Sequence, residues 1–368
     1  MELLALNKDF LQLTYMPYIN LQWKRRFFNV GTWSLQMLAK DFDKNTKYVW
    51  SPERPEVGII ERIEYSKEVR GEFIQVSGRF LESVLWRTFA YPHVEGNYSL
   101  WELAKNVIED IPPGTTNVRG SWWYRLEEFG NRIKVSPNAS TTIRKDVVWQ
   151  NRPIGECLEE TLKTLDMGQR FIFHPLTKNF TWEHWQGADH SKSVLFTDES
   201  TFVTSFTYEY DESGYKNHAV VFYGRNSIGN PYRFDQYTYE SGTMGKRCIL
   251  MNVDDTLTPQ ERSQKAIEEL ANYPIVKSAK IAVLQKEGGL FYLKDYNLGD
   301  RVGIACHGMQ EYFTAFITGI DEVFKRGRHE VKLTIGESTS SAYSRVAKYA
   351  RSTIWAKSTP IITPPTPS

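Results

Sequence analysis

The chain has 368 residues, and its 45 Lys and Arg against 44 Asp and Glu give a formal net charge of +1. Such a chain has no global field that draws it to DNA or to an anionic membrane, so any nucleic-acid contact must be local. Aromatic residues make up 14% of the chain. This content favours sheets or large subunit contacts, where aromatic side chains supply much of the buried area.

Neither a secretory leader nor a membrane span is expected. The N-terminus MELLALNKDF lacks a basic region followed by an apolar core, and no apolar run reaches the length of a membrane span. The cysteines, Cys157, Cys248 and Cys306, are odd in number, far apart and without CxxC spacing. We therefore expect reduced, structural thiols in a protein that folds in a cytoplasm.

Residues 1–95 read as one short strand after another, separated by turn residues, which predicts a small antiparallel β-barrel domain. Within it, the stretch INLQWKRRFFNVGTWSLQM at 19–37 alternates apolar and polar residues on both sides of a turn that contains Gly31. This pattern predicts a β-hairpin.

The three consecutive bases of this hairpin raise the question of nucleic-acid contact. Arg25 falls on the apolar face of the strand, whereas Lys24 and Arg26 fall on the polar face. We favour a solvated or subunit-facing position for the bases, because no groove-reading helix or stacking platform lies nearby in the sequence.

Three helices are predicted further along the chain. SLWELAKNVIED begins at Ser99 with Glu102 at capping-box spacing, and a helix from Thr258 has Pro259 at its first position. Between them, RPIGECLEETLKTLDMG is a helix for which Gly168 is a plausible C-cap. Polar residues 111–145 read as loops and a short hairpin.

The order of elements predicts a mainly β fold with an α+β insertion, built as tandem β-barrels. The first barrel domain is 1–95, completed by strands near 201–225, and the insertion domain is 96–200. A second barrel domain with one helix spans 201–340, and the Pro- and Thr-rich residues 341–368 form an extended linker or arm.

No catalytic or metal-binding pattern stands out. His174, His184 and His190 lie within seventeen residues, but they lack a zinc-ligand spacing and are better interpreted as polar strand and turn residues. Cys306 and His307 are neighbours on a predicted strand, where adjacent side chains diverge. GxSxG, P-loop and GxGxxG motifs are absent. We predict no enzyme, no catalytic residue, no metal site and no cofactor.

The stretch YNLGDRVGI predicts a turn that starts a strand. Leu298 precedes Gly299 and Asp300. We expect a positive φ at Gly299 and an Asp300 carboxylate that accepts backbone N–H groups of the turn, so the motif is architectural.

Several blocks together resemble a known family. They are LNKDFLQLTYMPYINLQWKRRFFNVGTWSLQM, EVGIIERIEYS with Gly58, IQVSGRFLESVLWRTF with Gly78, and the late YNLGDRVGI, TGIDEVF and VKLTIGES. The chain from Met1 to about Ser338 resembles the siphophage tail-hub or tail-associated proteins, whose fold is like the central baseplate hub of contractile-tailed phages.

The resemblance implies a structural protein of the phage tail tip. Two barrels from each subunit of a homotrimer would form a pseudo-sixfold ring that closes the tail tube and leaves a channel for DNA passage. The implied partners are the distal tail protein or tube ring, a receptor-binding protein, fibre or spike, and the tape-measure protein. The implied location is the virion, after assembly in the host cytoplasm.

In such a ring Lys24 and Arg26 face either a neighbouring subunit or the lumen. We favour the subunit, since bases in the lumen would attract phosphate and slow the passage of DNA.

Two rival functions remain open. A carbohydrate-binding tail protein would use Trp122, Trp123, Trp182 and Trp185 as stacking platforms, which requires that they be exposed in a line. A tail-associated cell-wall hydrolase is the other. Larger relatives carry a fibre or hydrolase domain, whereas this chain ends in a Pro-rich tail, which counts against both rivals.

Overall fold

The computed structural model describes residues 1–90, 94–109, 129, 132–149, 152–223, 233–238, 245–270, 273–325 and 328–336. Two compact units divide the chain. The first comprises Met1–Thr207 and Ala279–Gly336, and the second contains Tyr208–Ser278. Each unit is described below by itself.

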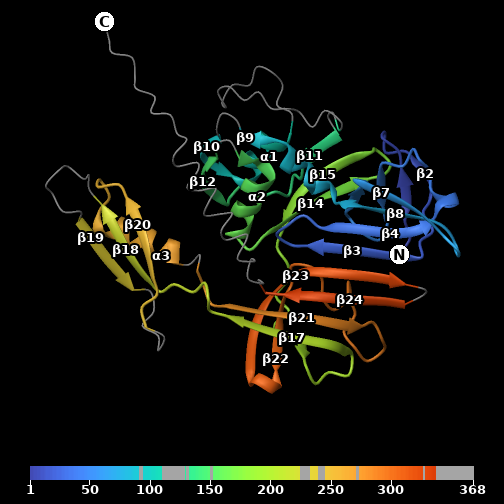
Figure 1. Ribbon diagram of the computed structural model, residues 1–368. Helices are drawn as coiled ribbons and strands as arrows, with labels where there is room; N and C mark the ends of the chain where they lie inside the picture. The colour runs from blue at the N-terminus through green and yellow to red at the C-terminus, as the bar shows by residue number, and fades with distance from the viewer. Residues whose placement is uncertain are drawn as a thin grey trace, which may run out of the picture. The chain divides into compact units, whose positions relative to one another are not determined.

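Strands dominate the part of the chain before the first α-helix (Figure 1). They are β1 (Leu4–Leu6), β2 (Gln12–Tyr15), β3 (Asn20–Arg26), β4 (Thr32–Leu38), β5 (Tyr48–Trp50), β6 (Val57–Ile59), β7 (Arg62–Glu68), β8 (Gly71–Arg79), β9 (Phe89–Ala90) and β10 (Val94–Ser99). Two 3₁₀ helices, η1 (Ala39–Asp41) and η2 (Leu81–Arg87), interrupt them.

Helices and strands mix in the next part of the chain. Its elements are α1 (Leu100–Ile108), β11 (Ile133–Val135), β12 (Arg144–Trp149), β13 (Arg152–Pro153), α2 (Ile154–Lys163), β14 (Gly168–His174), β15 (Asn179–Trp185) and β16 (Leu195–Thr197). The remaining elements are β17 (Val203–Asp211), β18 (His218–Tyr223), β19 (Arg233–Thr238), β20 (Cys248–Val253), α3 (Pro259–Leu270), β21 (Val276–Leu284), β22 (Arg301–Cys306), η4 (His307–Met309), β23 (Glu311–Lys325) and β24 (Arg328–Ile335).

A ten-stranded sheet organises the first unit. Eight of its strands follow the path β17-β21-β24-β23-β3-β4-β8-β7, and β22 with β16 branches from β23. The antiparallel pairing of β3 with β23, from Gly319 opposite Arg26 to Lys325 opposite Asn20, joins the N-terminal hairpin to the C-terminal strands. Figure 1 shows β4, β3, β23 and β24 side by side.

The predicted hairpin at 19–37 is confirmed. β3 alternates half-buried and buried residues along its length, and it pairs with β4 from Asn20 opposite Gln36 to Lys24 opposite Thr32. Trp23 and Trp33 are opposite each other and buried. Alternation places these rings in one core while the intervening polar residues stay on the other face.

The strands near 201–225, which the sequence pattern assigns to the first barrel, have the following partners among the described strands. β17 lies beside β21 in the large sheet, and β18 pairs with β19 and β20 in a separate sheet. The local pattern identified both segments as strands, but their partners lie outside 1–95. The assignment of 1–95, 96–200 and 201–340 to separate domains stays a prediction, and 341–368 lie outside the described residues.

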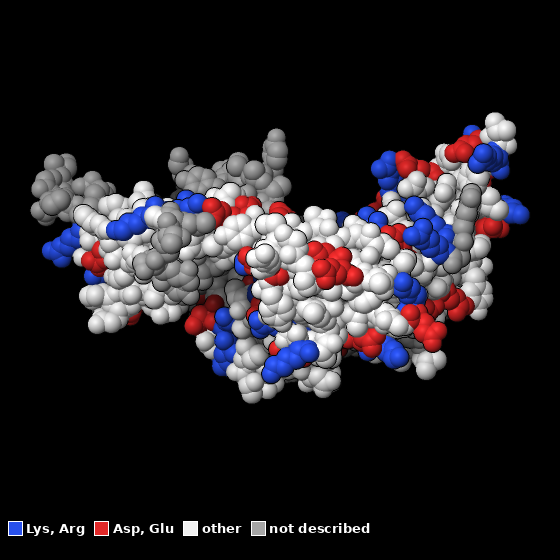
Figure 2. All heavy atoms as spheres, turned by 90° about the horizontal axis from the view of Figure 1, so that it is seen from below, with Lys and Arg blue, Asp and Glu red and all other residues white. Residues whose placement is uncertain are grey.

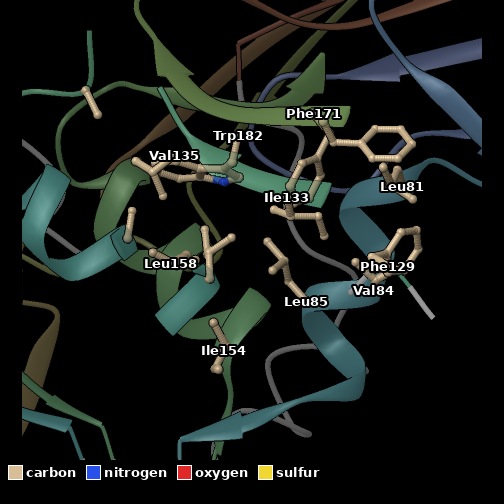
Figure 3. Packing of buried hydrophobic residues seen from close by; sticks show 14 of the residues in the cluster. Leu81, Val84, Leu85, Phe129, Ile133, Val135, Ile154, Leu158, Phe171 and Trp182 are labelled. Carbon is tan, nitrogen blue, oxygen red and sulfur yellow. The ribbon is translucent and has the colours of Figure 1, made fainter. Parts of the chain in front are cut away.

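The mixed region of the chain builds a core of its own. η2 and α2 pack against the sheet β11-β15-β14, in which β11 runs parallel to β15. Figure 3 shows the contributions of these elements: Leu81, Val84 and Leu85 from η2, Ile154 and Leu158 from α2, and Phe171 and Trp182 from the two long strands. Helices therefore cover one side of this small sheet.

The capping predictions are confirmed, with one correction. Ser99 and Glu102 form a complete capping box on α1, and the Thr258 amide donates to the Glu261 carboxylate before α3. Gly168 is not the C-cap of α2. That helix ends at Lys163 with Thr164 as its cap, and Gly168 is the first residue of β14.

The fold class is mainly β, as predicted. A further four-stranded sheet in the first unit has the order β2-β1-β5-β6, and the second unit holds β19-β18-β20 with α3. Among the described strands the eight-strand path is open and does not pair into a closed barrel. The described residues contain no helix long and apolar enough to cross a membrane, and all three cysteines are free.

Candidate functional site

A buried ion pair lies at the centre of the large sheet. Arg25 on β3 points into the core, where its Nη2 is 2.6 Å from Oε1 of Glu56. Its Nη1 also donates to the Tyr292 hydroxyl at 2.5 Å and to Asn297. Burial alone would lower the pKa of Arg25, but Glu56 and Tyr292 raise it above the ordinary value. Arg25 is therefore a permanent cation that the interior has neutralised.

A second buried ion pair lies in the same core. Arg54 donates to both carboxylate oxygens of Glu322 on β23, at 2.8 and 2.5 Å. His329 Nε2 lies 3.2 Å from the same carboxylate. Burial by itself would raise the pKa of Glu322, but the hydrogen bonds from Arg54 and His329 lower it below its ordinary value.

The two ion pairs together join distant parts of the chain. They connect β3 and the turn before β6 to β23 and to the loop that precedes β22, across sequence separations of up to 272 residues. Each charge has a fixed partner of opposite sign, so the cluster offers no free acid, base or nucleophile. Its role is to fix how these segments pack.

Sequence reasoning missed most of this cluster. Glu56, Arg54, Tyr292 and Glu322 were not singled out, because their partners are not local. The available signal was Arg25, the only charge on the apolar face of its strand. A base in that position must find a buried acid, since an unpaired charge in a core is very costly.

The turn before β22 has the predicted architecture. Gly299 has a φ of 89°, and a Cβ at that position would lie 2.5 Å from the Phe27 ring. Asp300 is buried, and its Oδ1 and Oδ2 accept the N–H groups of Ala188 and Asn297 at 2.9 and 2.7 Å. Leu298 is buried in the core of this region. The carboxylate therefore joins two backbone segments.

The motif glycines lie where the backbone is approached closely. A Cβ on Gly31 would lie 2.5 Å from the Phe80 ring. One on Gly58 would clash with the Trp33 indole, and one on Gly78 would clash with the Ile59 carbonyl oxygen. The sequence predicted a structural role for these positions but not which neighbours require them.

Lys24 and Arg26 lie on the polar face of the eight-strand path. Arg26 forms an ion pair with Asp321 on β23, with Nη1 2.5 Å from Oδ1, and Lys24 is opposite Asp321 in register. On β3, β4 and β8 this face also carries the uncharged residues Asn20, Gln22, Thr32, Ser34, Gln36, Leu38, Phe73, Gln75 and Ser77, together with the charged Arg79. Asp321 therefore offsets part of the positive charge of the hairpin.

Charges of both signs also mix elsewhere on the surface. On the face shown in Figure 2, Lys and Arg side chains are interspersed with Asp and Glu and separated by wide uncharged areas. This distribution agrees with the near-zero net charge of the chain.

Two strands end the path of the large sheet. At one end all seven residues of β7 are exposed, including Ile63 at 50% and Tyr65 at 58%. At the other end is β17. Among the described strands neither has a partner on its outer side. Such edges carry N–H and C=O groups that can pair with another chain.

The three histidines considered as metal ligands each have a different partner in the structure. His174 contacts Thr181, His184 accepts the Ser140 N–H, and His190 lies 3.8 Å from Asp300. Within the described ranges no group of three or more His, Cys, Asp and Glu residues could hold a metal ion. Cys306 is buried, and the ring of His307 lies against Asp198.

The tryptophans of the carbohydrate hypothesis do not form an exposed line in the described part of the chain. Trp182 is buried and donates its Nε1–H to Gln169. Trp185 packs edge-on against Phe27. Trp122 and Trp123 lie outside the described residues.

The fold is that of phage tail proteins, to which several solved structures are similar. The 43 kDa tail protein of prophage MuSo2 from Shewanella oneidensis is 13% identical, covers 91% of this chain and 97% of its own, and has a TM-score of 0.60. A tail protein from Neisseria meningitidis MC58 is 13% identical over 92% of this chain and 96% of its own, with a TM-score of 0.57. The prophage tail protein gp18 from Listeria monocytogenes EGD-e is 12% identical over 95% and 99%, with a TM-score of 0.54.

A family model also matches residues 127–337, more than half of the chain. The chain belongs to the family described as Siphovirus ReqiPepy6 Gp37-like protein. Fold and family together make it a phage tail protein of the siphovirus type. No curated protein matches the sequence.

Proposed function

We propose that this protein is a structural hub of the tail tip, a homotrimeric ring that surrounds a channel for DNA. The observation that carries the proposal is the open eight-strand path, which ends in β7 on one side and β17 on the other. Pairing of β7 in one copy with β17 in the next is a head-to-tail contact, and such contacts form rings when the rotation closes.

The polar face of the path suits the lining of a channel. Three copies of eight strands would give a closed 24-stranded barrel. Barrels of about 16 to 18 strands already enclose an aqueous channel, so a larger one has room for a duplex. The two buried ion pairs would hold the N-terminal and C-terminal strands of each copy together in one continuous wall.

This arrangement would place Lys24 and Arg26 on the lumen side, rather than against a subunit as the sequence argument favoured. The bases would retain DNA less than that argument assumed, because Asp321 pairs with Arg26 and lies opposite Lys24. β7, β23 and β24 add charges of both signs to this face, among them Arg62, Glu64, Lys325, Glu330 and Lys332. Phosphate would therefore meet acids as well as bases along the wall, which weakens its retention.

The ring would connect the tail tube or distal tail protein to a receptor-binding protein, fibre or spike, with the tape-measure protein in its channel before ejection. We assign the chain no catalytic step and no cofactor. It would act in the virion, after assembly in the host cytoplasm. These assignments extend the family resemblance to this chain.

An edge variant tests the ring. Ile63→Lys with Tyr65→Lys adds charge to the exposed edge strand, a change that blocks strand pairing between chains. Val69→Lys is the matched control, since Val69 is fully exposed in the turn beyond β7. We expect native mass spectrometry to find trimers for the parent and the control but folded monomers for the edge variant. A parent protein that is monomeric in solution and present in only one or two copies per tail would contradict the trimer.

A further inference from the structure

The second unit has a sheet with one face covered by a helix. α3 packs on the side of the sheet that carries Ala219, Val221, Ile249 and Met251. Asp235 on this side is bound by Arg262 of the helix, with Nε 2.7 Å from Oδ2. Among the described residues, the buried hydrophobic members of this core are Ala219, Val221, Ala266 and Leu270. A core of this size gives a small unit little stability by itself.

The opposite face carries a continuous apolar patch, which we call the open face. It comprises Val220 and Phe222 of β18, Phe234 of β19 and Leu250 of β20. Val220 is in register with Leu250, and Phe222 is in register with Phe234, with ring centroids 6.1 Å apart. Leu250 is 74% exposed and Phe234 is 53% exposed. Contiguous exposed apolar residues of this kind mark a contact surface.

The chemistry of the rim indicates what covers the open face. Its strand neighbours on the same side are Gln236, Thr238, Cys248, Asn252 and the buried His218, which hydrogen-bonds to Thr238. No Lys, Arg, Asp or Glu belongs to this side of the three strands. A face without charge can meet a copy of itself without repulsion. A charged partner would leave its own charges unpaired there.

The C-terminal residues 337–368 of the same chain are the other candidate to cover the open face. β24 ends at Ile335, which pairs with Ala279, the first residue after the second unit, and residues 337–368 come next in the sequence. Their sequence holds four bases, Arg345, Lys348, Arg351 and Lys357, against the single acid Glu337. The open face offers these bases no acid, and the charge pattern therefore favours a second copy.

We propose that the open face is buried against the same face of a second copy of this chain. Contact between identical faces is two-fold, so it is separate from the ring proposed above and would join two copies through their second units. The contact would cover the exposed apolar residues Phe234 and Leu250, and it would add an interface separate from the sheet edges β7 and β17.

Cys248 is a natural reporter for this contact. It lies on the open face two residues before Leu250, and it is exposed, whereas Cys157 and Cys306 are buried. Maleimide should therefore label Cys248 first in the full-length native protein, and Cys248→Ser should abolish the fast reaction. A short bismaleimide should join two copies through this thiol only if the faces meet.

The experiment measures mass and Cys248 labelling over a range of protein concentrations. We expect fast labelling in the dilute monomer and labelling slowed about tenfold or more in the oligomer, because a covered thiol reacts only after local opening. Bismaleimide should yield covalent dimers from the oligomer and none from Cys248→Ser. Leu250→Asp should weaken self-association about tenfold or more, as expected for a residue central to a contact. Leu176→Asp, a change at another exposed leucine, should not.

The outcomes separate this inference from the proposed function. A trimer whose Cys248 reacts as fast as in the monomer would overturn the inference and leave the hub standing. A face-to-face dimer with a protected Cys248 would support the inference and contradict the trimer. Slow labelling already in the dilute monomer would overturn it, since the cover would then come from the chain itself. Protection that requires another tail protein would also overturn it.

Discussion

Arg25 and Glu56 form an ion pair in the interior of the first unit, with the Arg25 Nη2 2.6 Å from the Glu56 Oε1 and both side chains nearly inaccessible to solvent. The segments that carry them are not neighbours in a sheet, so this pair connects β3 to the turn before β6. Removing one partner of such a pair leaves the other as an unpaired buried charge.

The first prediction concerns this pair. Arg25→Ala should lower the free energy of unfolding by about 3 to 5 kcal/mol, because Glu56 would lose its cation in a dry core. Lys24→Ala is the neighbouring control on the polar face and should cost less than about 1 kcal/mol, the usual worth of an exposed charge. Chemical denaturation of both variants measures the difference. Equal midpoints for the two would contradict the assigned role of Arg25.

The second prediction concerns Gly299. Gly299→Ala should destabilise the protein by more than about 1 kcal/mol, since a positive φ already costs about that much and the new Cβ would press on the Phe27 ring. Gly288→Ala is the matched control, because Gly288 has a similar φ of 81° and nothing within 4 Å of the added carbon. Thermal melts should rank Gly299→Ala as the more harmful. If the two melt alike, the Phe27 contact contributes nothing.

The third prediction concerns Asp300. An asparagine at this position would keep one side-chain oxygen that can accept a hydrogen bond. In the structure both carboxylate oxygens accept a backbone N–H, from Ala188 and from Asn297. Asp300→Asn would turn one acceptor into a donor that faces another donor. We expect a loss of about 1 to 3 kcal/mol, the cost of an unsatisfied buried polar group.

Asp189→Asn serves as the control for this change. Oδ1 of Asp189 accepts the Ser191 N–H in an exposed turn, and an amide oxygen can replace it there. Denaturant titrations of the two variants should therefore differ clearly. If Asp300→Asn lowered the free energy of unfolding only slightly, the N–H group of Ala188 or Asn297 would be bonded to water instead.

The fourth prediction is a dependence of stability on pH through Glu82. Burial raises the pKa of Glu82 to about 7, although its Oε1 accepts the Phe171 N–H at 3.0 Å. The folded protein therefore holds a proton that the unfolded chain releases near its ordinary pKa. Stability from this group is fully present below that ordinary pKa and is lost as the pH rises to about 7.

Glu82→Gln isolates this contribution. The amide oxygen can still accept from Phe171 and cannot ionise, so the variant should be more stable than the parent above pH 7, by up to a few kcal/mol, and should show a flatter profile between about pH 5 and 7. The pKa of Glu159 is also raised to about 7 by burial, so the difference between variant and parent is the quantity to measure. An identical pH slope in both would exclude Glu82 as the titrating group.

The sequence by itself determined the features that depend on a few neighbouring residues. Alternation over 19–37 predicted the hairpin and its buried face, capping-box spacing predicted the start of α1 at Ser99, and a Gly-Asp pair predicted the turn before β22. Each of these follows from local backbone geometry and hydrogen bonding within one or two turns of chain.

Only the tertiary structure decided the partners. Alternation shows that Arg25 points into a core, but it does not show that Glu56 and Tyr292 are its partners there. No local signal predicts that β3 pairs with β23, which lies almost the whole chain away in sequence. The same is true of β17 and β18, which were recognised as strands but whose neighbours β21, β19 and β20 were not foreseen. A strand's own residues specify which of its faces is buried, whereas its edges offer the same N–H and C=O groups to every candidate neighbour, so pairing is settled by the packing of the whole unit.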